Sequence, residues 1–260
     1  MSAALIRVSL RLRAPAALIA SAGMVAVLLA VGALFPSVGH AIGRLSLPQS
    51  VVNLLGGADY ATVTGWFRSE IGSVYGPLVV GSLAISGAAA LTAGEEEERI
   101  MALLLSYPVS RTRLLAARAV AVMLVVAIIS IGILIGLLAG VAAAGGGIAF
   151  THMVALTVQI AGFGLAVGAL ALALAAASGR RSLAVGVSAA VAVLGWLVNS
   201  FAPLVSDLGW LRYLSFFHYY AAQDPLGRGF DLPGLAVLLG IAVLLTGLAA
   251  LALERRDLRG

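Results

Sequence analysis

The sequence contains no cysteine and no lysine, and only 11 of its 260 residues are acidic. Without cysteine the chain can form no disulfide, no thiolate metal site and no cysteine nucleophile. Without lysine it can hold no Walker A motif, because that motif uses a lysine to contact the nucleotide phosphates. The catalytic patterns HExxH and GxSxG are missing as well. The sequence therefore predicts no catalytic centre, metal site or cofactor within this chain.

Apolar residues dominate the sequence: 62% of the residues are hydrophobic, 10% are charged, and the mean hydropathy is +1.09. A membrane-spanning helix needs about 20 mostly apolar residues, and the apolar runs do not alternate with polar residues as β-barrel strands do. We therefore predict an all-α integral membrane protein that forms one domain over residues 1–260. Its six spans are expected at residues 14–35, 71–93, 114–144, 153–177, 182–205 and 232–253.

The 16 basic residues are all arginine, and most of them flank one set of span ends. Only Arg44, Arg68, Arg212 and Arg228 fall on the side away from the termini and residues 94–113. The positive-inside rule then places both termini and residues 94–113 in the cytoplasm. Because the arginines lie beside the membrane, they predict contact with anionic lipid rather than with nucleic acid. We expect a multi-pass plasma-membrane protein, set in the inner membrane of a bacterium.

Residues 1–13 precede the first span and have an amphipathic pattern. Leu5, Val8 and Leu12 share one helical face, and Arg7 and Arg11 share the other. This pattern predicts a short helix lying in the cytoplasmic membrane interface. The alternative is a plain basic topology signal.

Two outer connections are too apolar to be simple solvated loops. Residues 36–70 are interrupted by proline and glycine, so we expect short helices in the outer leaflet, anchored by Trp66 and Phe67. Residues 206–232 are rich in aromatic side chains and predict a re-entrant or interfacial segment over the outer mouth of the bundle. An ordinary aromatic belt is the alternative. The residues proposed for an outer gate are Trp66, Trp210, Phe216, Phe217, Tyr219 and Tyr220.

The spans hold few polar side chains, which bears on the class of transport. Ion-coupled transporters need ionisable groups within the bilayer, and selective channels need rings of polar groups. Neither pattern is present, so the spans favour a pathway for a lipophilic or amphipathic substrate with energy supplied from elsewhere. Gln159, Trp196 and Asn199 are candidates for lining that pathway. Packing between helices is the alternative role for each of them.

Residues 94–113, with the sequence GEEEERIMALLLSYPVSRTR, form a cytoplasmic connector that is both charged and apolar. Ile100, Leu103, Leu104 and Tyr107 share one helical face, and so apolar a cytoplasmic helix needs a partner that buries it. Pro108 ends this helix.

A cluster of opposite charges surrounds that helix. Residues 95–98 are four consecutive glutamates, while Arg111, Arg113 and Arg118 mark the start of the third span, where Ser110 can cap the helix. Adjacent carboxylates repel one another, so we expect these glutamates to pair with the arginines or with arginines of a partner. A solvated acidic run is the alternative.

Small residues recur at helix-packing spacing in two spans. Gly132, Gly136 and Gly140 form one row, and Gly164 and Gly168 form a second. Such rows let helix backbones approach closely. They predict tight packing, either within the chain or between subunits.

The connector resembles that of the permease subunits of ABC-2 type exporters, six-helix proteins that bind a separate ATPase. The matching features are the acidic cluster, the leucines, the PVSR turn and the basic start of the third helix, while Arg99 and Ile100 stand where the family commonly has glycine and threonine. The six-span order, the motif DPLGRGFD and the closing LERRDL are also similar to these permeases. The resemblance covers nearly the whole chain.

This resemblance implies an ABC-2 bundle of the type V exporter kind, in which residues 99–107 form a coupling helix that docks on the ATPase. It implies two ATPase chains that carry ATP and magnesium, a second permease chain that is identical or related, and export of a drug, an antibiotic or a lipid. The residues assigned to ATPase coupling are Glu95, Glu96, Glu97, Glu98, Arg99, Ile100, Leu103, Leu104, Tyr107, Pro108, Arg111 and Arg113.

Two other functions fit the sequence less well. A multi-pass scaffold would use the apolar connector to dock a partner that is not an ATPase. A secondary transporter would drive flux from an ion gradient, which the scarcity of ionisable residues in the spans disfavours.

Overall fold

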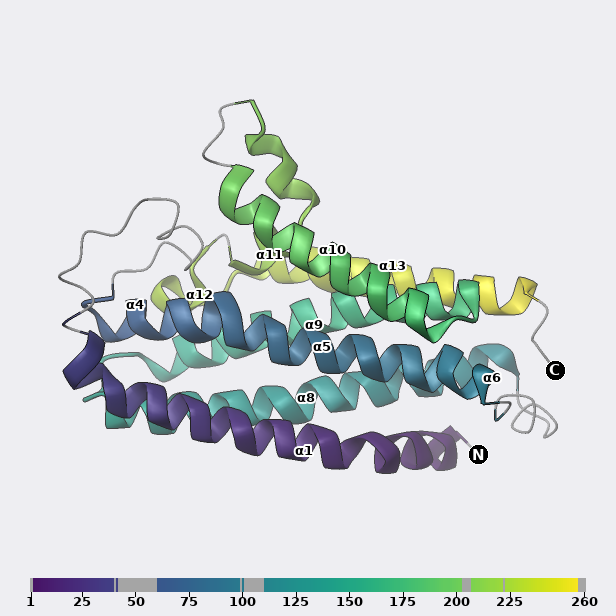
Figure 1. The fold of residues 1–260 in the computed structure, drawn as a ribbon, viewed down its shortest axis with the longest axis horizontal. Coiled ribbons are helices and arrows are strands. Elements are labelled where there is room, and N and C mark those ends of the chain that lie inside the picture. The colour runs from purple at the N-terminus through teal and green to yellow at the C-terminus, as the bar shows by residue number, and fades with distance from the viewer. Residues whose placement is uncertain are drawn as a thin grey trace.

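The computed structural model describes residues 2–39, 41, 60–98, 100, 110–202, 207–221 and 223–256. Within these residues the chain is helical and contains no strand, and six helices are long and apolar enough to cross a membrane (Figure 1). The prediction of an all-α protein with six spans is confirmed.

The helices follow one another along the chain as an antiparallel bundle with short connecting helices. The α-helices are α1 (Ser2–Leu34), α4 (Val63–Phe67), α5 (Gly76–Ala89), α6 (Glu95–Glu97), α8 (Arg111–Ala143), α9 (Phe150–Ser178), α10 (Arg181–Phe201), α11 (Phe216–Ala221), α12 (Pro225–Arg228) and α13 (Leu232–Arg255). Segments Phe35–Gly39, Arg68–Tyr75 and Ala90–Gly94 are π-helical, and Gly209–Leu214 is a 3₁₀ helix.

The two ends of the bundle differ in composition. The start of α1, α6, the start of α8 and the end of α13 lie together at one end, which we call the arginine-rich end (Figure 1). The opposite end holds α4, α11 and α12 and is called the aromatic end. Helix α9 lies at the centre, in contact with α5, α8, α10 and α13.

Helix α1 departs from the prediction for residues 1–13. It continues without a break from Ser2 to Leu34, so the first residues extend the first span instead of forming a separate interfacial helix. The reason lies in Ser9, which is fully buried and accepts a hydrogen bond from Arg118 of α8. This polar turn is therefore held against the bundle.

The second span also begins earlier than predicted. Helical structure runs from Val63 to Glu97, so it starts within the region expected to form an outer loop. Trp66 and Phe67 are buried between helices rather than anchored in the membrane interface. The indole Nε1 of Trp66 donates to the carbonyl oxygen of Val31 at 2.9 Å, which joins this span to α1. Residues 42–59 of the predicted outer loop lie outside the described residues.

The glycine row of α8 packs against α1 within the chain, which confirms the prediction of close helix packing. A Cβ added at Gly132 would lie 2.6 Å from the Cβ of Ser21, and one added at Gly140 would lie 2.3 Å from the backbone oxygen of Leu28. The Ser21 hydroxyl donates to the carbonyl oxygen of Ile128 at 2.9 Å. Because lipid gives helices no hydrophobic drive to associate, this close contact holds α1 in place.

Replacing Gly140 with leucine tests this contact. A side chain at Gly140 meets backbone atoms that cannot move aside, so Gly140→Leu should lower the stability of the protein by about 1–3 kcal/mol or more. Gly23→Leu on α1 is the control, because a Cβ there meets nothing within 4 Å. Thermal unfolding of the two purified variants measures the difference. Equal stability would show that α1 does not depend on this contact.

Candidate functional site

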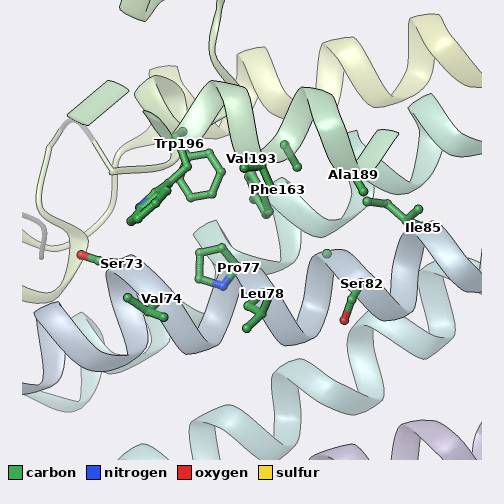
Figure 2. Close-up of a pocket in the computed structure, with 13 residues that line it drawn as sticks. Ser73, Val74, Pro77, Leu78, Ser82, Ile85, Phe163, Ala189, Val193 and Trp196 are labelled. Carbon is green, nitrogen blue, oxygen red and sulfur yellow. The ribbon is translucent and has the colours of Figure 1, made fainter. Parts of the chain in front are cut away.

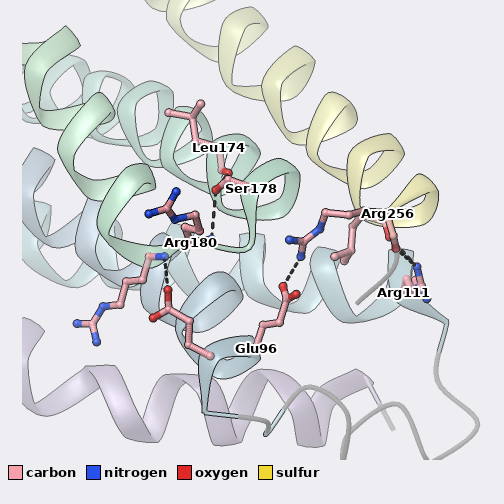
Figure 3. Close-up of polar contacts among 9 residues, drawn as sticks. Glu96, Arg111, Leu174, Ser178, Arg180 and Arg256 are labelled. Atoms are coloured by element: carbon pink, nitrogen blue, oxygen red, sulfur yellow. Dashed lines mark hydrogen bonds and ion pairs between the residues drawn. The ribbon is translucent and has the colours of Figure 1, made fainter. Parts of the chain in front are cut away.

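The glutamates of the connector are largely paired within the chain. Glu95 and Glu96 are buried, and they form ion pairs with Arg118 of α8 and Arg256 at the end of α13. The expectation that arginines neutralise this cluster is confirmed for Glu95 and Arg118. Figure 3 shows Glu96 directed toward Arg256. Two buried carboxylates thus tie α6 to two different spans.

Glu97 makes a third connection, to α10. Its Oε1 accepts a hydrogen bond from the backbone N–H of Arg181 at 2.9 Å, in the first turn of that helix. Backbone N–H groups at a helix start lack partners within the helix. The negative charge also favours the positive end of the helix dipole. Glu97 therefore acts as a cap supplied by another helix.

The Arg118 guanidinium extends the network to α1. It donates to the hydroxyl of Ser9 as well as to Glu95, and that hydroxyl donates to the carbonyl oxygen of Leu5 at 2.8 Å. A buried ion pair contributes stability only when further hydrogen bonds satisfy its remaining polar atoms. Ser9 provides one such bond, and it makes Arg118 a bridge between α6 and α1.

Arg111, in the first turn of α8, binds the end of α13 at the arginine-rich end. Its Nη1 donates to the carbonyl oxygens of Leu253 at 3.0 Å and Arg256 at 2.7 Å (Figure 3). Carbonyl groups in the last turn of a helix have no partner within that helix, and a cation there also favours the helix dipole. Arg111 thus joins the start of α8 to the end of α13.

The remaining residues assigned to coupling are placed only in part. Arg99, Leu103, Leu104, Tyr107 and Pro108 lie outside the described residues. Ile100 is 41% exposed, and Glu98 and Arg113 are exposed as well. Ser110 caps α8 as predicted, accepting from the backbone N–H of Arg113 at 3.3 Å.

A separate apolar pocket lies between α5, α9, α10 and α11. Its volume is about 300 Å³, within the range of small-molecule sites. Figure 2 shows Ala189, Val193 and Trp196 of α10 across from Pro77 and Leu78 of the second span. Among the described residues, those that line it are Ser73, Val74, Pro77, Leu78, Gly81, Ser82, Ile85, Phe163, Ala189, Ala192, Val193, Trp196 and Phe217.

The chemistry of this pocket is almost wholly hydrocarbon and aromatic. None of its described lining residues is charged. The Ser82 hydroxyl donates to the carbonyl oxygen of Val79 at 3.1 Å, and the Ser73 hydroxyl donates to that of Arg68 at 3.3 Å. Both hydroxyl protons therefore go to the backbone. A lipophilic molecule is the ligand that such a surface accepts without unpaired polar groups.

The three predicted pathway residues fall in different places. Trp196 lines the pocket, whereas Gln159 and Asn199 are not among its lining residues. Gln159 is 1% exposed, and its Nε2 donates to the carbonyl oxygen of Asp231 at 2.8 Å, which joins α9 to the start of α13. The role of Trp196 in a pathway stays a prediction, and the placement of Gln159 matches the packing alternative.

Sequence reasoning missed most of the pocket. Ala189, Ala192, Val193 and Trp196 are spaced as one helical face, so a periodicity search within the fifth span could have found that wall. Phe163 belongs to α9 and carries no local signal of this kind. Its place in the pocket depends on how the helices pack.

Aromatic side chains of α9 and α11 pack together at the pocket. The ring of Phe163 contacts Phe217, with 4.6 Å between centroids, and Tyr220, with 5.7 Å. Tyr220 is buried, and burial raises the pKa of its phenol. The phenol therefore stays protonated and donates to the carbonyl oxygen of Gly72 at 2.5 Å. This bond joins α11 to the π-helical segment at the start of the second span.

The six residues proposed for an outer gate do not form one cluster. Phe217 lines the pocket, Tyr220 packs against the lining residue Phe163, and Trp66 is buried against α1. Trp210 is 59% exposed, Phe216 is half-buried, and the phenol of Tyr219, also half-buried, donates to the carbonyl oxygen of Tyr213 at 2.9 Å. A gating role for any of them stays a prediction.

An ion pair fixes the motif DPLGRGFD at the aromatic end. Asp224 pairs with Arg68 at 3.0 Å and caps α12 by accepting from the backbone N–H of Gly227 at 3.2 Å. Asp224 also has a positive φ of 51°, a conformation that aspartate tolerates better than most residues. This pair ties the connection between α10 and α13 to the start of the second span.

The chain matches one known family over nearly its whole length. Residues 5–253 match the model of the family described as multidrug efflux system permease Rv1217c, C-terminal domain. The chain belongs to this family. Its membership confirms the resemblance to ABC-type permeases read from residues 94–113. No curated protein matches the chain in sequence.

Removing the charge of Glu95 tests the network at the arginine-rich end. Glu95→Gln leaves the buried Arg118 charge without its partner, which should cost about 3–5 kcal/mol of stability. The double variant Glu95→Met with Arg118→Met should recover most of that loss. Glu98→Gln, at an exposed position, should have little effect. Thermal unfolding of the purified variants is the measurement, and a stable Glu95→Gln single variant would contradict the role given to the pair.

Proposed function

We propose that this chain is the membrane-spanning permease of an ATP-driven multidrug efflux system and that it exports lipophilic or amphipathic compounds. The observation that carries the proposal is the apolar pocket between α5 and α10, in a chain of the efflux permease family. The pocket has the size and surface chemistry of a site for a lipophilic small molecule.

The energy for transport comes from a partner in this proposal. The sequence has no Walker A motif, and its apolar connector face is suited to docking. Residues 99–107 form the coupling helix, and a separate ATPase carries ATP and magnesium. Two ATPase copies and a second permease chain, identical or related, complete the transporter.

The ion pairs at the arginine-rich end provide a route for the motion. A push on the coupling helix reaches α6 first, because α6 lies just before it in the chain. From α6 the motion passes to α8 through the ion pair of Glu95, to α13 through the ion pair of Glu96, and to α10 through the hydrogen bond of Glu97. The second span itself runs from Glu95 to the pocket wall at Ile85, over about 15 Å of helix. A displacement at α6 thus acts on two walls of the pocket.

The orientation follows the distribution of arginines. The arginine-rich end lies in the cytoplasm with both termini, and the aromatic end faces outward. Substrate enters the pocket from the membrane and leaves past the aromatic end. The setting is the plasma membrane of a bacterium.

Two substitutions in the connector test the coupling. Leu104→Asp with Tyr107→Asp places charges on the proposed docking face, so the ATPase should no longer co-purify with the permease. Leu214→Asp is the control, because Leu214 is 75% exposed at the aromatic end and should leave the complex intact. Undiminished ATPase binding by the connector variant would refute the coupling role.

Filling the pocket tests substrate transport separately. Val193→Trp places a large side chain in the pocket, whereas Val191→Trp makes the same change two residues away, at a position that does not line it. The first variant should lose most efflux of a lipophilic fluorescent dye from cells, and the second should keep it. Both should still bind the ATPase. Normal efflux by Val193→Trp would show that substrate takes another path.

A further inference from the structure

A second apolar hollow lies on another face of the bundle, between α8, α9 and α13. It has a volume of about 430 Å³ and shares no described lining residue with the pocket in Figure 2. Val120 and Met123 of α8, Leu165 of α9 and Leu239 and Val243 of α13 are among the residues that line it. Met123 is 47% exposed and Val243 is 74% exposed, so this groove opens on the lipid-facing surface.

The lining of the groove offers a ligand no polar partner. Among the described residues that line it, only Thr246 carries a polar side chain. The Thr246 hydroxyl donates to the carbonyl oxygen of Ala242 at 2.8 Å and is therefore already satisfied. An unfilled groove would also leave its walls without dispersion contacts. A hydrocarbon chain from the membrane matches this surface.

The position of the groove identifies which lipid headgroup it meets. Val120 lies nine residues after the start of α8 and Thr246 nine residues before the end of α13, about 14 Å from the arginine-rich end. That end carries Arg111 and Arg113 on α8 and Arg255 and Arg256 on α13. Two carboxylates oppose these four arginines, namely Glu254 and the Glu96 that pairs with Arg256. The excess of positive charge favours an anionic headgroup.

Arg113 is the arginine placed to hold that headgroup. It lies seven residues before Val120, two helical turns away on the same stripe of α8, and it is exposed. Helical side chains lean toward the helix N-terminus, so the Arg113 guanidinium extends toward the headgroup layer. Arg111 is already bound to backbone carbonyls at the end of α13, and Arg256 is already paired with Glu96.

We propose that the groove between α8, α9 and α13 binds an acyl chain of an anionic phospholipid and that Arg113 holds the phosphate of its headgroup. The lipid comes from the leaflet at the arginine-rich end. It fills the space between α8 and α13, further from the arginine-rich end than the point where Arg111 joins these helices. There it stabilises the contact between them.

Native mass spectrometry of the full chain tests this proposal with two lipids of equal chain length. Given equal amounts of phosphatidylglycerol and phosphatidylcholine, the wild type should bind phosphatidylglycerol preferentially. Arg113→Gln should weaken that binding roughly fivefold, the effect of one arginine near an anionic surface. Arg228→Gln, which removes an exposed charge at the opposite end, should leave it unchanged.

A groove-filling variant separates this site from general charge attraction. Ala242→Phe fills the groove and should abolish the preference, whereas Leu244→Phe, at a 63% exposed position on the same helix, should keep it. Ala119→Val, a smaller change on α8, gives a second filling variant should the first not fold. Equal binding of the two lipids by the wild type, or an undiminished preference in both filling variants, would overturn the proposal.

Discussion

The burial of two glutamates at the arginine-rich end is the constraint on which the arrangement of the bundle depends. A carboxylate removed from water needs an opposite charge and further hydrogen bonds. Glu95 finds them in Arg118, which in turn holds Ser9 of α1, and Glu96 finds them in Arg256. These pairs fix the ends of α1, α8 and α13 against a single helical turn. Elsewhere the spans are joined by single hydrogen bonds, by close backbone contact and, at the aromatic end, by the partly exposed pair of Arg68 and Asp224.

The second span connects that anchor to the pocket. One helical stretch from Val63 to Glu97 lines the pocket in its middle and ends in the buried glutamates. π-helical segments lie on both sides of α5, the first ending beside the pocket and the second ending next to Glu95. Such segments often occur at functional positions of helices. The two regions that the proposed coupling links are therefore parts of one element.

Sequence patterns predicted the features that depend on local chemistry. Six apolar runs, the Ser110 cap and the glycine row of α8 were each readable from neighbouring residues. The start of the second span could not be read in this way. The helix that begins at Val63 is held by the hydrogen bond from Trp66 to Val31 of α1, a contact between distant residues. Charge alone predicted an arginine partner for Glu95. It did not predict the pair of Glu96 and Arg256, because these residues are 160 positions apart in the sequence. The pocket was not predicted either, because its lining residues come from four helices that are far apart in the sequence.

Helix α10 is a pocket wall that α6 contacts through a hydrogen bond between the two helices. Its first turn is capped by Glu97, and near its other end the carbonyl oxygen of Gly195 accepts a hydrogen bond from the Ser215 hydroxyl at 2.8 Å. Between these two points the face toward the pocket is apolar, and apolar contacts are not directional. A helix held at its ends by hydrogen bonds and along its length by such contacts can shift with little loss of bonding. Since Glu97 is one of the two fixed points, a movement of α6 must move α10 or break that cap.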